Sequence, residues 1–351
     1  MTPSRFALRL SRLLALGGLV AASLPALALD KVVFYTNWLH QVEFGGFYTA
    51  QATGIYKAHG LDVEIKPGGP QVNGSMLLLG GKADFVLLHT NGQIISAAEQ
   101  NIPMVALAAT YQKHPQVIVT HKGAGHDTLE SLKGKPIFLS QDSKSSFWPW
   151  LKQRYGYTES QVRPYTFQMA PFLASKSAIQ QSFLTSEPYA LTSAGADINV
   201  FLLSDHGWGP VSMPIVTRKD VLEKNPDLAK RFIRATLEGW YSFLADQGPA
   251  RAVVKKLAPE TTEGQMDYSI KQMVDKGIVL SGAALEKGIG TMDLAKWQSF
   301  YDEMSGVGLY KKGLDVSSMF TTQFINDPAF VKEMQAKYPK AFPATKAAVA
   351  R

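Results

Sequence analysis

Short strand-like runs alternate with helix-like runs along the first third of the chain, and this alternation limits the possible folds more than any other feature. Strand-like runs occupy residues 31–36, 61–66, 83–88 and 104–111. A helix-like stretch, broken at most by one glycine, lies between each pair of these runs. Strands separated by helices pair in parallel within an α/β sheet. Right-handed crossovers then place every strand-to-helix loop at one edge of that sheet.

The pattern begins again at residues 128–140, where a short helix is followed by a strand. Helix, strand, helix and strand are then predicted at 145–156, 164–169, 174–181 and 182–186. Residues 119–207 therefore predict a second α/β unit inserted within the first. After residue 218 the chain is mainly helical. Its strongest helix runs over 225–246, with Asn225 as N-cap and Pro226 at the first helical position.

The first 28 residues have the pattern of a cleaved secretory signal peptide. Arg5, Arg9 and Arg12 form a basic start, an apolar stretch follows at 13–24, and small residues precede the expected cleavage after Ala28. The apolar stretch is too short to span a bilayer. We therefore expect the signal peptide, residues 1–28, to be cleaved off and the rest of the chain to reside in the periplasm.

Composition and motif content exclude several classes of protein. The net charge of +7 is spread without a Lys/Arg-rich run, which argues against nucleic-acid binding. The absence of cysteine removes disulfides, thiol nucleophiles and thiolate metal sites. The seven histidines show no metal-ligand spacing, and the common hydrolase, phosphate-loop and zinc-protease motifs are missing. We predict a protein that is not an enzyme, without a cofactor, a metal site or catalytic residues.

Polar and aromatic residues gather where predicted strands end. In open α/β sheets, ligands bind at the carboxyl ends of strands, and the backbone N–H groups that begin the following helices favour acceptors. Two lobes with such edges facing each other form a cleft. The candidate ligand-binding residues are Trp38, Glu43, Phe44, Tyr48, His89, Thr90, Ser143, Ser146, Trp148, Glu187, Tyr189 and Trp208.

The chemistry of these candidates favours a flat ligand. Trp38 can stack on a planar ring, and Glu43 or Glu187 can accept hydrogen bonds from ring amino groups. A sulfonate would instead need N–H donors, an arginine or a lysine, and neither Arg154 nor Arg163 follows a predicted strand. The cleft is therefore predicted to take a neutral or weakly cationic aromatic compound.

Two questions stay open at this stage. Gly45 and Gly46 allow close backbone approach, either by a ligand or by a neighbouring segment of the protein. In the predicted helix after residue 145, Phe147 and Trp150 share a face and Trp148 points elsewhere. We expect one of these rings in the core and another in the cleft.

Several motifs carry a family likeness. The sequence W-x(4)-E-F-G-G-F-Y-x-A from Trp38, GIYKAHGLDVEI at 54–65 and GKADF at 81–85 resemble the periplasmic solute-binding proteins of ABC importers. The likeness continues through LKGKPIFLS, TSEPY, GIGTMDLAKWQSFYDEM and GLDVSSMFTTQF. It points to the branch that takes nitrate, sulfonates, taurine and thiamine pyrimidine precursors. The loop after Trp38 is most similar to the pyrimidine-precursor and riboflavin-type members.

The resemblance implies an α/β, two-lobed periplasmic binding protein fold of type II with one ligand between the lobes. We expect a first lobe of 29–118 and 208–351, a second lobe of 119–207, and crossings near 115–122 and 205–215. It also implies a monomer that delivers a small molecule, such as a thiamine pyrimidine precursor, to a membrane permease and its ATPase.

Other functions remain as alternatives. The same fold would bind an aliphatic sulfonate, taurine or a nitrate-like anion if the cleft presented enough donors. A periplasmic sensor subunit would have an identical cleft. The fold also resembles the eukaryotic pyrimidine-precursor synthases, which consume a histidine and pyridoxal phosphate and depend on a cysteine-rich iron segment. The missing cysteine and the predicted signal peptide argue against that enzyme.

Overall fold

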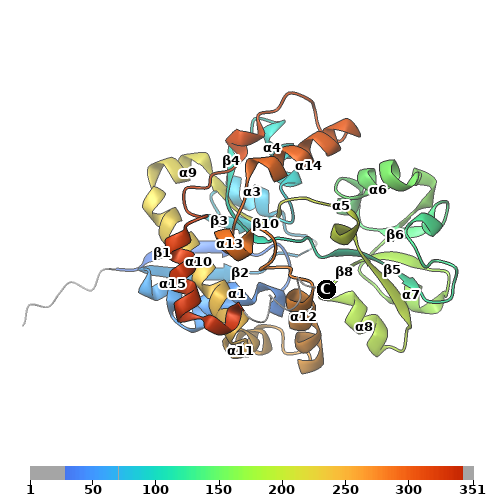
Figure 1. The fold of residues 1–351 in the computed structure, drawn as a ribbon, viewed down its shortest axis with the longest axis horizontal. Helices are drawn as coiled ribbons and strands as arrows, with labels where there is room; N and C mark the ends of the chain where they lie inside the picture. Colours follow the sequence, from blue (N-terminus) through green and yellow to red (C-terminus); the bar gives the residue numbers. More distant parts are fainter. Residues whose placement is uncertain (1–27, 70, 343–351) are drawn as a thin grey trace, which may run out of the picture.

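The computed structural model describes residues 28–69 and 71–342, and these residues form two lobes, each built on one five-stranded sheet (Figure 1). The predicted signal peptide lies outside the described residues except for Ala28. Within the described part of the chain, none of the helices combines the length and apolar character needed to cross a membrane.

The sheet of the first lobe has the strand order β2-β1-β3-β10-β4. Its strands are β1 (Asp30–Tyr35), β2 (Leu61–Lys66), β3 (Phe85–Leu87), β4 (Met104–Tyr111) and β10 (Ser212–Arg218). β1 runs parallel to β2 and β3, whereas β10 runs antiparallel to both β3 and β4. Every residue of β4 is buried although β4 is last in the order. The C-terminal region covers it through bridges from Ala106 to Phe320 and from Ala109 to Gly290.

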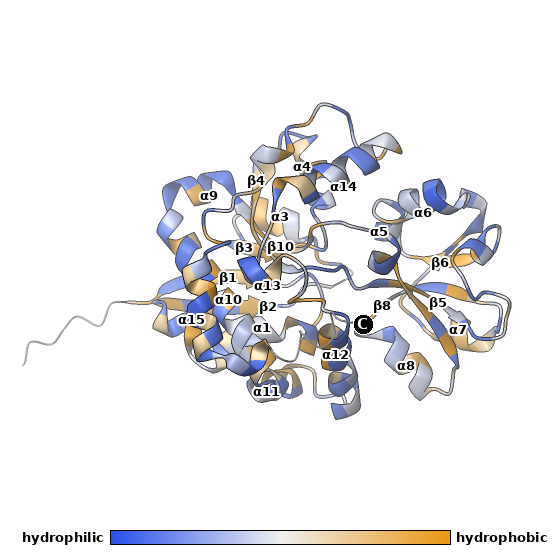
Figure 2. Cartoon of the chain, viewed as in Figure 1, coloured by the Kyte–Doolittle hydropathy of each residue, from blue (hydrophilic) through white to orange (hydrophobic). Residues whose placement is uncertain are grey.

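The sheet of the second lobe repeats this plan with the order β7-β6-β8-β5-β9. Its strands are β5 (Gln116–His121), β6 (Ile137–Leu139), β7 (Val162–Pro164), β8 (Ile179–Phe183) and β9 (Ile198–Leu202). β6 is parallel to β7 and β8, and β5 is antiparallel to β8 and β9. β4 and the centre of β5 are hydrophobic, while many residues of the outer helices are hydrophilic (Figure 2).

The chain passes between the sheets at residues 112–115, between β4 and β5, and at 203–211, between β9 and β10. The first connection is short, so the end of β4 lies near the start of β5. Gln116 at the start of β5 pairs with Phe183 at the end of β8. The carboxyl ends of the parallel strands of both sheets therefore face each other. The sequence-based boundary after residue 118 falls inside β5, and the one after residue 207 falls inside the second connection.

Helices cover both sheets. Those of the first lobe are α1 (Gly45–Ala52), α2 (Ile55–Ala58), α3 (Gly74–Leu79), α4 (Gly92–Ala98), α9 (Lys219–Lys224), α10 (Pro226–Ala245), α11 (Gly248–Leu257), α12 (Glu263–Asp275), α13 (Ala284–Lys287), α14 (Leu294–Gly306) and α15 (Pro328–Lys337). Those of the second lobe are α5 (Gln141–Lys144), α6 (Trp148–Tyr155), α7 (Ala170–Ala174) and α8 (Glu187–Ser193). Short 3-10 turns are η1 (Val42–Phe44), η2 (Glu130–Leu132), η3 (Glu159–Gln161), η4 (Leu203–His206), η5 (Val316–Met319) and η6 (Pro339–Ala341).

The glycine pair at the start of α1 serves helix packing. A Cβ on Gly46 would lie 2.2 Å from the ring of Trp240 in α10, and one on Gly45 would lie 2.2 Å from the ring of Phe243. On the facing helix, a Cβ on Gly239 would lie 2.4 Å from the carbonyl oxygen of Gly46. The two helices thus approach each other through glycine surfaces that admit no side chain. Of the two uses that the sequence left open for Gly45 and Gly46, the structure shows close packing against a neighbouring segment of the protein, helix α10.

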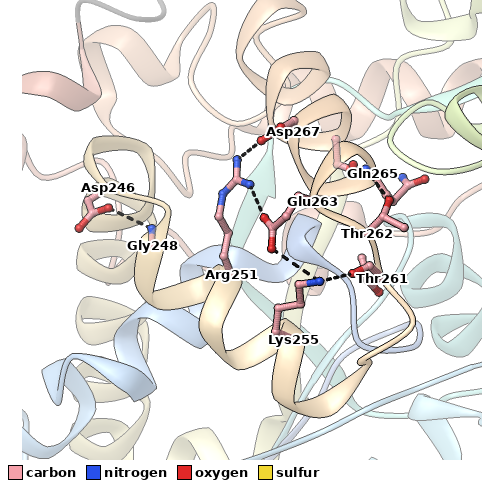
Figure 3. A network of polar contacts seen from close by, with 10 residues as sticks. Asp246, Gly248, Arg251, Lys255, Thr261, Thr262, Glu263, Gln265 and Asp267 are labelled. Carbon is pink, nitrogen blue, oxygen red and sulfur yellow. Dashed lines mark hydrogen bonds and ion pairs between the residues drawn. The ribbon is translucent and has the colours of Figure 1, made fainter.

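Helix α12 is paired with its neighbour α11 through charged side chains (Figure 3). Arg251 of α11 pairs with Glu263 at 3.2 Å and with Asp267 at 2.6 Å, both in α12. α12 also reaches the second lobe, because Gln265 Nε2 (2.8 Å) and Ser269 Oγ (2.5 Å) both donate to the carbonyl oxygen of Thr185. α12 therefore links the two lobes in addition to the two chain crossings.

Two predicted elements of the second lobe differ from the structure. The strand predicted at 164–169 ends at Pro164, and the next five residues form a loop in which Phe167 has a left-handed φ of 60°. The helix predicted at 174–181 is wrong, because residues 179–183 form the strand β8. By contrast, α10 is confirmed with its predicted cap, since Asn225 accepts a hydrogen bond from the backbone N–H of Leu228.

Candidate functional site

A cavity of about 440 Å³ lies between the facing sheet edges and is lined by residues of both lobes. Of the candidates from the sequence, the structure places eight in its lining: Trp38, Glu43, His89, Thr90, Ser143, Ser146, Glu187 and Trp208. Its volume falls within the range of pockets that enclose drug-sized ligands.

Four other candidates lie away from the lining. Phe44 and Tyr48 are buried in the core of the first lobe, where the Tyr48 hydroxyl contacts His40 Nδ1 at 2.9 Å. Trp148 is buried in the second lobe, and its Nε1 donates to Glu159 at 3.2 Å. Tyr189 packs on Tyr268 of α12, with ring centroids 5.7 Å apart. In each case the side chain satisfies a packing or hydrogen-bonding need of the protein itself, so these four are left out of the proposed site.

Trp38 is held by a tightly packed loop after β1. The Thr36 hydroxyl (2.8 Å) and the backbone N–H of Gly68 (3.0 Å) both donate to the carbonyl oxygen of Trp38. A Cβ on Gly68 would lie 2.5 Å from the carbonyl oxygen of Thr36, so this approach requires glycine. The indole is half-buried and meets the ring of Phe167 from the second lobe, with centroids 5.1 Å apart and planes at 50°.

Two carboxyl groups, one from each lobe, line the cavity, Glu43 buried and Glu187 half-buried. Glu43 in η1 accepts a hydrogen bond from the hydroxyl of Thr185 in the second lobe. Burial raises the pKa of Glu43 to about 7, and the nearby Glu187 adds to the rise. Glu187 accepts from the backbone N–H of Phe183 at 2.8 Å and from the Tyr165 hydroxyl at 3.3 Å. Burial also raises the pKa of Glu187.

The two histidines of the lining are neutral near pH 7. Asn37 Nδ2 donates to His89 Nδ1 at 2.9 Å, which puts the imidazole proton on Nε2. Burial lowers the pKa of His89, although Asp142 opposes this effect. Burial, together with the neighbouring His89 and Lys296, lowers the pKa of His114 to about 3. Neither ring supplies a positive charge to the cavity.

Backbone N–H groups at the strand ends are largely bonded within the protein. Gln93 Oε1 accepts from the N–H of His89 at 2.8 Å. Gln181 Oε1 accepts from the N–H of Ser140 at 2.6 Å and from the hydroxyl of Ser143 at 2.5 Å. Because the amide oxygen of Gln181 is used twice, its Nε2 is the group left to donate to a ligand. The sequence analysis expected such N–H groups to donate to acceptor atoms of a ligand, but side-chain oxygens of the protein accept from several of them.

Residues that the sequence analysis missed complete the lining, among them Asn37, Asp142, Phe167 and Gln181. Gln181 was assigned to a helix and Phe167 to a strand, so neither was expected at a sheet edge. A signal for Gln181 was present in the polar run Gln180-Gln181-Ser182, because side chains of this kind in a buried strand need polar partners.

The charge of the lining is distinctive. It includes the carboxyl groups of Glu43, Asp142 and Glu187 and, within the described residues, contains no lysine or arginine. No group of three or more potential metal-ligating His, Asp or Glu side chains occurs in the described part of the chain. The arrangement suits a ligand that donates hydrogen bonds and carries no negative charge.

Comparison with known proteins agrees with the two-lobed architecture. Residues 41–250, more than half of the chain, match the model of a family described as NMT1/THI5 like. The chain belongs to the NMT1/THI5-like family. It is 22% identical over 305 residues to the riboflavin-binding protein RibY of Chloroflexus aurantiacus, covering 85% of this chain and 86% of RibY.

More distant similarities extend to an enzyme and to a solved structure. The 4-amino-5-hydroxymethyl-2-methylpyrimidine phosphate synthase of Aspergillus parasiticus is 27% identical over 115 residues, 32% of each chain. The periplasmic aliphatic sulphonate-binding protein SsuA of Escherichia coli superposes with a TM-score of 0.61 at 13% identity, over 83% of this chain and 91% of SsuA. At that identity the likeness shows a shared fold. The predicted two-lobed periplasmic binding protein fold is confirmed for this NMT1/THI5-like protein.

Proposed function

We propose that this NMT1/THI5-like protein is the solute-binding component of an ABC importer and that its cleft binds a flat heterocycle without negative charge. The observation that carries the proposal is the lining: carboxyl groups from both lobes, aromatic rings, and neither lysine nor arginine within the described residues. The predicted signal peptide, the periplasmic location, the monomeric state and the permease and ATPase partners belong to the same proposal.

An anionic ligand fits this lining poorly. A sulfonate would lie among Glu43, Asp142 and Glu187, and no guanidinium or ammonium group of the described lining would pair with it. Backbone N–H groups that would otherwise bind its oxygens are bonded to Gln93, Gln181 and Glu187. A buried charge without a partner is strongly unfavourable. The structural similarity to a sulphonate-binding protein therefore supports the fold and not the ligand.

The cavity favours a ligand larger than one six-membered ring. Glu43 and Glu187 would accept hydrogen bonds from imide or amino N–H groups, and Trp38 offers an aromatic surface. Ser143, Ser146 and the Gln181 amide would meet hydroxyl groups on a side chain. A flavin such as riboflavin has all three features, and the similarity to RibY supports this choice. A thiamine pyrimidine precursor, which the sequence favoured, has the ring and the amino group but would fill less of the cavity.

Ligand uptake would follow from closure of the lobes about the connections at 112–115 and 203–211. Lys113 and Asp205 join these connections at 3.2 Å. A ligand that contacts both lobes favours the closed arrangement, because only that arrangement forms all of its contacts. The hydrogen bond from the Thr185 hydroxyl to Glu43 also joins the two lobes.

Isothermal titration calorimetry of the purified protein tests the proposal. Riboflavin, an aminopyrimidine precursor, taurine and an alkanesulfonate form the panel. We expect riboflavin to bind most tightly, the pyrimidine more weakly, and the two sulfonates not at all. Preference for a sulfonate would refute the ligand class. For the enzyme alternative, pyridoxal phosphate that becomes covalently attached to the protein on borohydride reduction would support a synthase instead of a binding protein, whereas a yellow colour alone would not, because riboflavin is also yellow.

A further inference from the structure

Phe167 has a backbone conformation that its residue type does not favour. The described residues contain four non-glycine residues with positive φ: Asn101, Phe167, Met213 and Asn326. Asparagine enters this region more readily than other residues, so Asn101 and Asn326 are ordinary cases. Phe167 and Met213 are the exceptions, and both line the cavity between the lobes. Backbone conformations of this kind cluster at ligand-binding sites.

The phenylalanine ring is also exposed, which sets it apart. Phe167 is 39% exposed, and every other phenylalanine of the described residues is buried or half-buried. Phe172, five positions further on, is fully buried and stacks on His121 with centroids 4.2 Å apart. Phe172 therefore performs the packing role of this segment, and the Phe167 ring is not needed for the core of the second lobe.

The ring of Phe167 contacts two other aromatic rings. Its centroid is 5.1 Å from that of Trp38 in the first lobe and 5.1 Å from that of Tyr165 in its own lobe. The Tyr165 hydroxyl donates to Glu187 at 3.3 Å. Phe167 thus contacts a tyrosine that is itself hydrogen-bonded to a carboxylate of the cavity.

We infer that Phe167 is the second half of an aromatic clamp whose first half is Trp38, and that this clamp selects flat ligands. The inference rests on the proposed function and adds to it a specificity-determining residue on the opposite lobe. A planar ring between two others needs centroid separations of about 7 Å, twice the contact distance of carbon atoms. At 5.1 Å the two rings contact each other, so a flat ligand enters when the lobes part and then replaces that contact.

Binding of riboflavin to four single variants tests the clamp. Phe167→Ala should weaken binding about three- to tenfold through loss of ring stacking. Phe167→Tyr keeps the ring and should stay within twofold of the wild type. Leu173→Ala is the matched control, because Leu173 is equally exposed on the same lobe, at 38%, and lies outside the cavity lining. Circular dichroism establishes that each variant is folded.

The fourth variant, Phe167→Gly, separates the ring from its backbone. It should bind riboflavin as weakly as Phe167→Ala but unfold at a higher temperature than Phe167→Ala, because glycine adopts positive φ without steric cost. A Phe167→Ala variant that binds within twofold of the wild type would overturn the clamp alone. A wild-type protein that binds a sulfonate and no flat compound would overturn the proposed function, and the clamp with it.

Discussion

Replacing Glu43 with glutamine should stabilise the protein in alkaline solution and have little effect in acid. The substitution keeps the shape of the side chain and an oxygen that accepts from the Thr185 hydroxyl, but it removes the charge. Glu43 is almost completely buried, with 2% of its surface exposed. Burial raises its pKa from 4.5 to about 7, so the folded protein holds this proton more tightly than the unfolded chain does.

The sign and the size of the change in the free energy of unfolding follow from that pKa shift. A carboxyl group with a raised pKa leaves the free energy of unfolding intact below about pH 4.5 and lowers it as the pH rises toward 7. The whole loss corresponds to on the order of 3 kcal/mol. Glu43→Gln should therefore gain up to about that amount over the wild type at pH 8, and the difference should fall below about 1 kcal/mol at pH 5.

Urea denaturation of both proteins from pH 5 to pH 8 measures the effect. Glu187 faces Glu43 from the second lobe, and Tyr48 and Tyr111 also lie near it. These three groups are present in both proteins, so the contributions of their own titrations largely cancel in the difference in the free energy of unfolding. Glu286→Gln, at an exposed position, is the control. Its free energy of unfolding should differ little from that of the wild type at every pH. A Glu43→Gln variant whose stability difference does not change with pH would refute the argument that Glu43 is buried as a carboxylate between the lobes.

Three further substitutions give sharp expectations. Trp38→Ala should weaken riboflavin binding at least about tenfold in calorimetry while circular dichroism stays unchanged, because the aromatic surface is lost. Gly46→Ala should lower the free energy of unfolding in urea by about 1–3 kcal/mol or more, because the new Cβ would lie 2.2 Å from the ring of Trp240. Arg251→Ala should cost less than about 1 kcal/mol in the same assay, because its partners in Figure 3 are solvent-exposed.

Each of these has an outcome that would count against it. Unchanged affinity of Trp38→Ala would remove the indole from the binding site. A Gly46→Ala variant as stable as the wild type would mean that α1 and α10 can separate without cost. A loss well above 1 kcal/mol for Arg251→Ala would show that the pairing of α11 with α12 also fixes the lobes, through the bonds of α12 to Thr185.

Much of the fold was predictable because its signals are local. Asn225 and Pro226 mark the start of α10 by their own chemistry, and the alternation of strands and helices leads directly to parallel sheets with loops at one edge. The position of Trp38 at that edge followed from the end of β1. The predicted boundary after residue 118 lies within β5, whereas the polar run at 112–115 is the segment that connects β4 to β5.

The details of the site depended on long-range contacts that no local pattern contains. Trp148 and Phe147 are neighbours in sequence, but only packing against Glu159 and Tyr157 directs the former away from the cavity. Phe167 lies in a run of strand-forming residues, and its left-handed backbone depends on the surroundings. The glycine pair of α1 was open between two uses until the structure placed Trp240 against Gly46.

The central claim is that the cavity between the lobes holds a flat compound without negative charge. Mass spectrometry of the small molecule that remains bound after the protein is purified from periplasm under native conditions tests it most directly. The account predicts a planar, hydrogen-bond-donating heterocycle in a one-to-one complex. An aliphatic sulfonate or another small anion bound in the same ratio would contradict it.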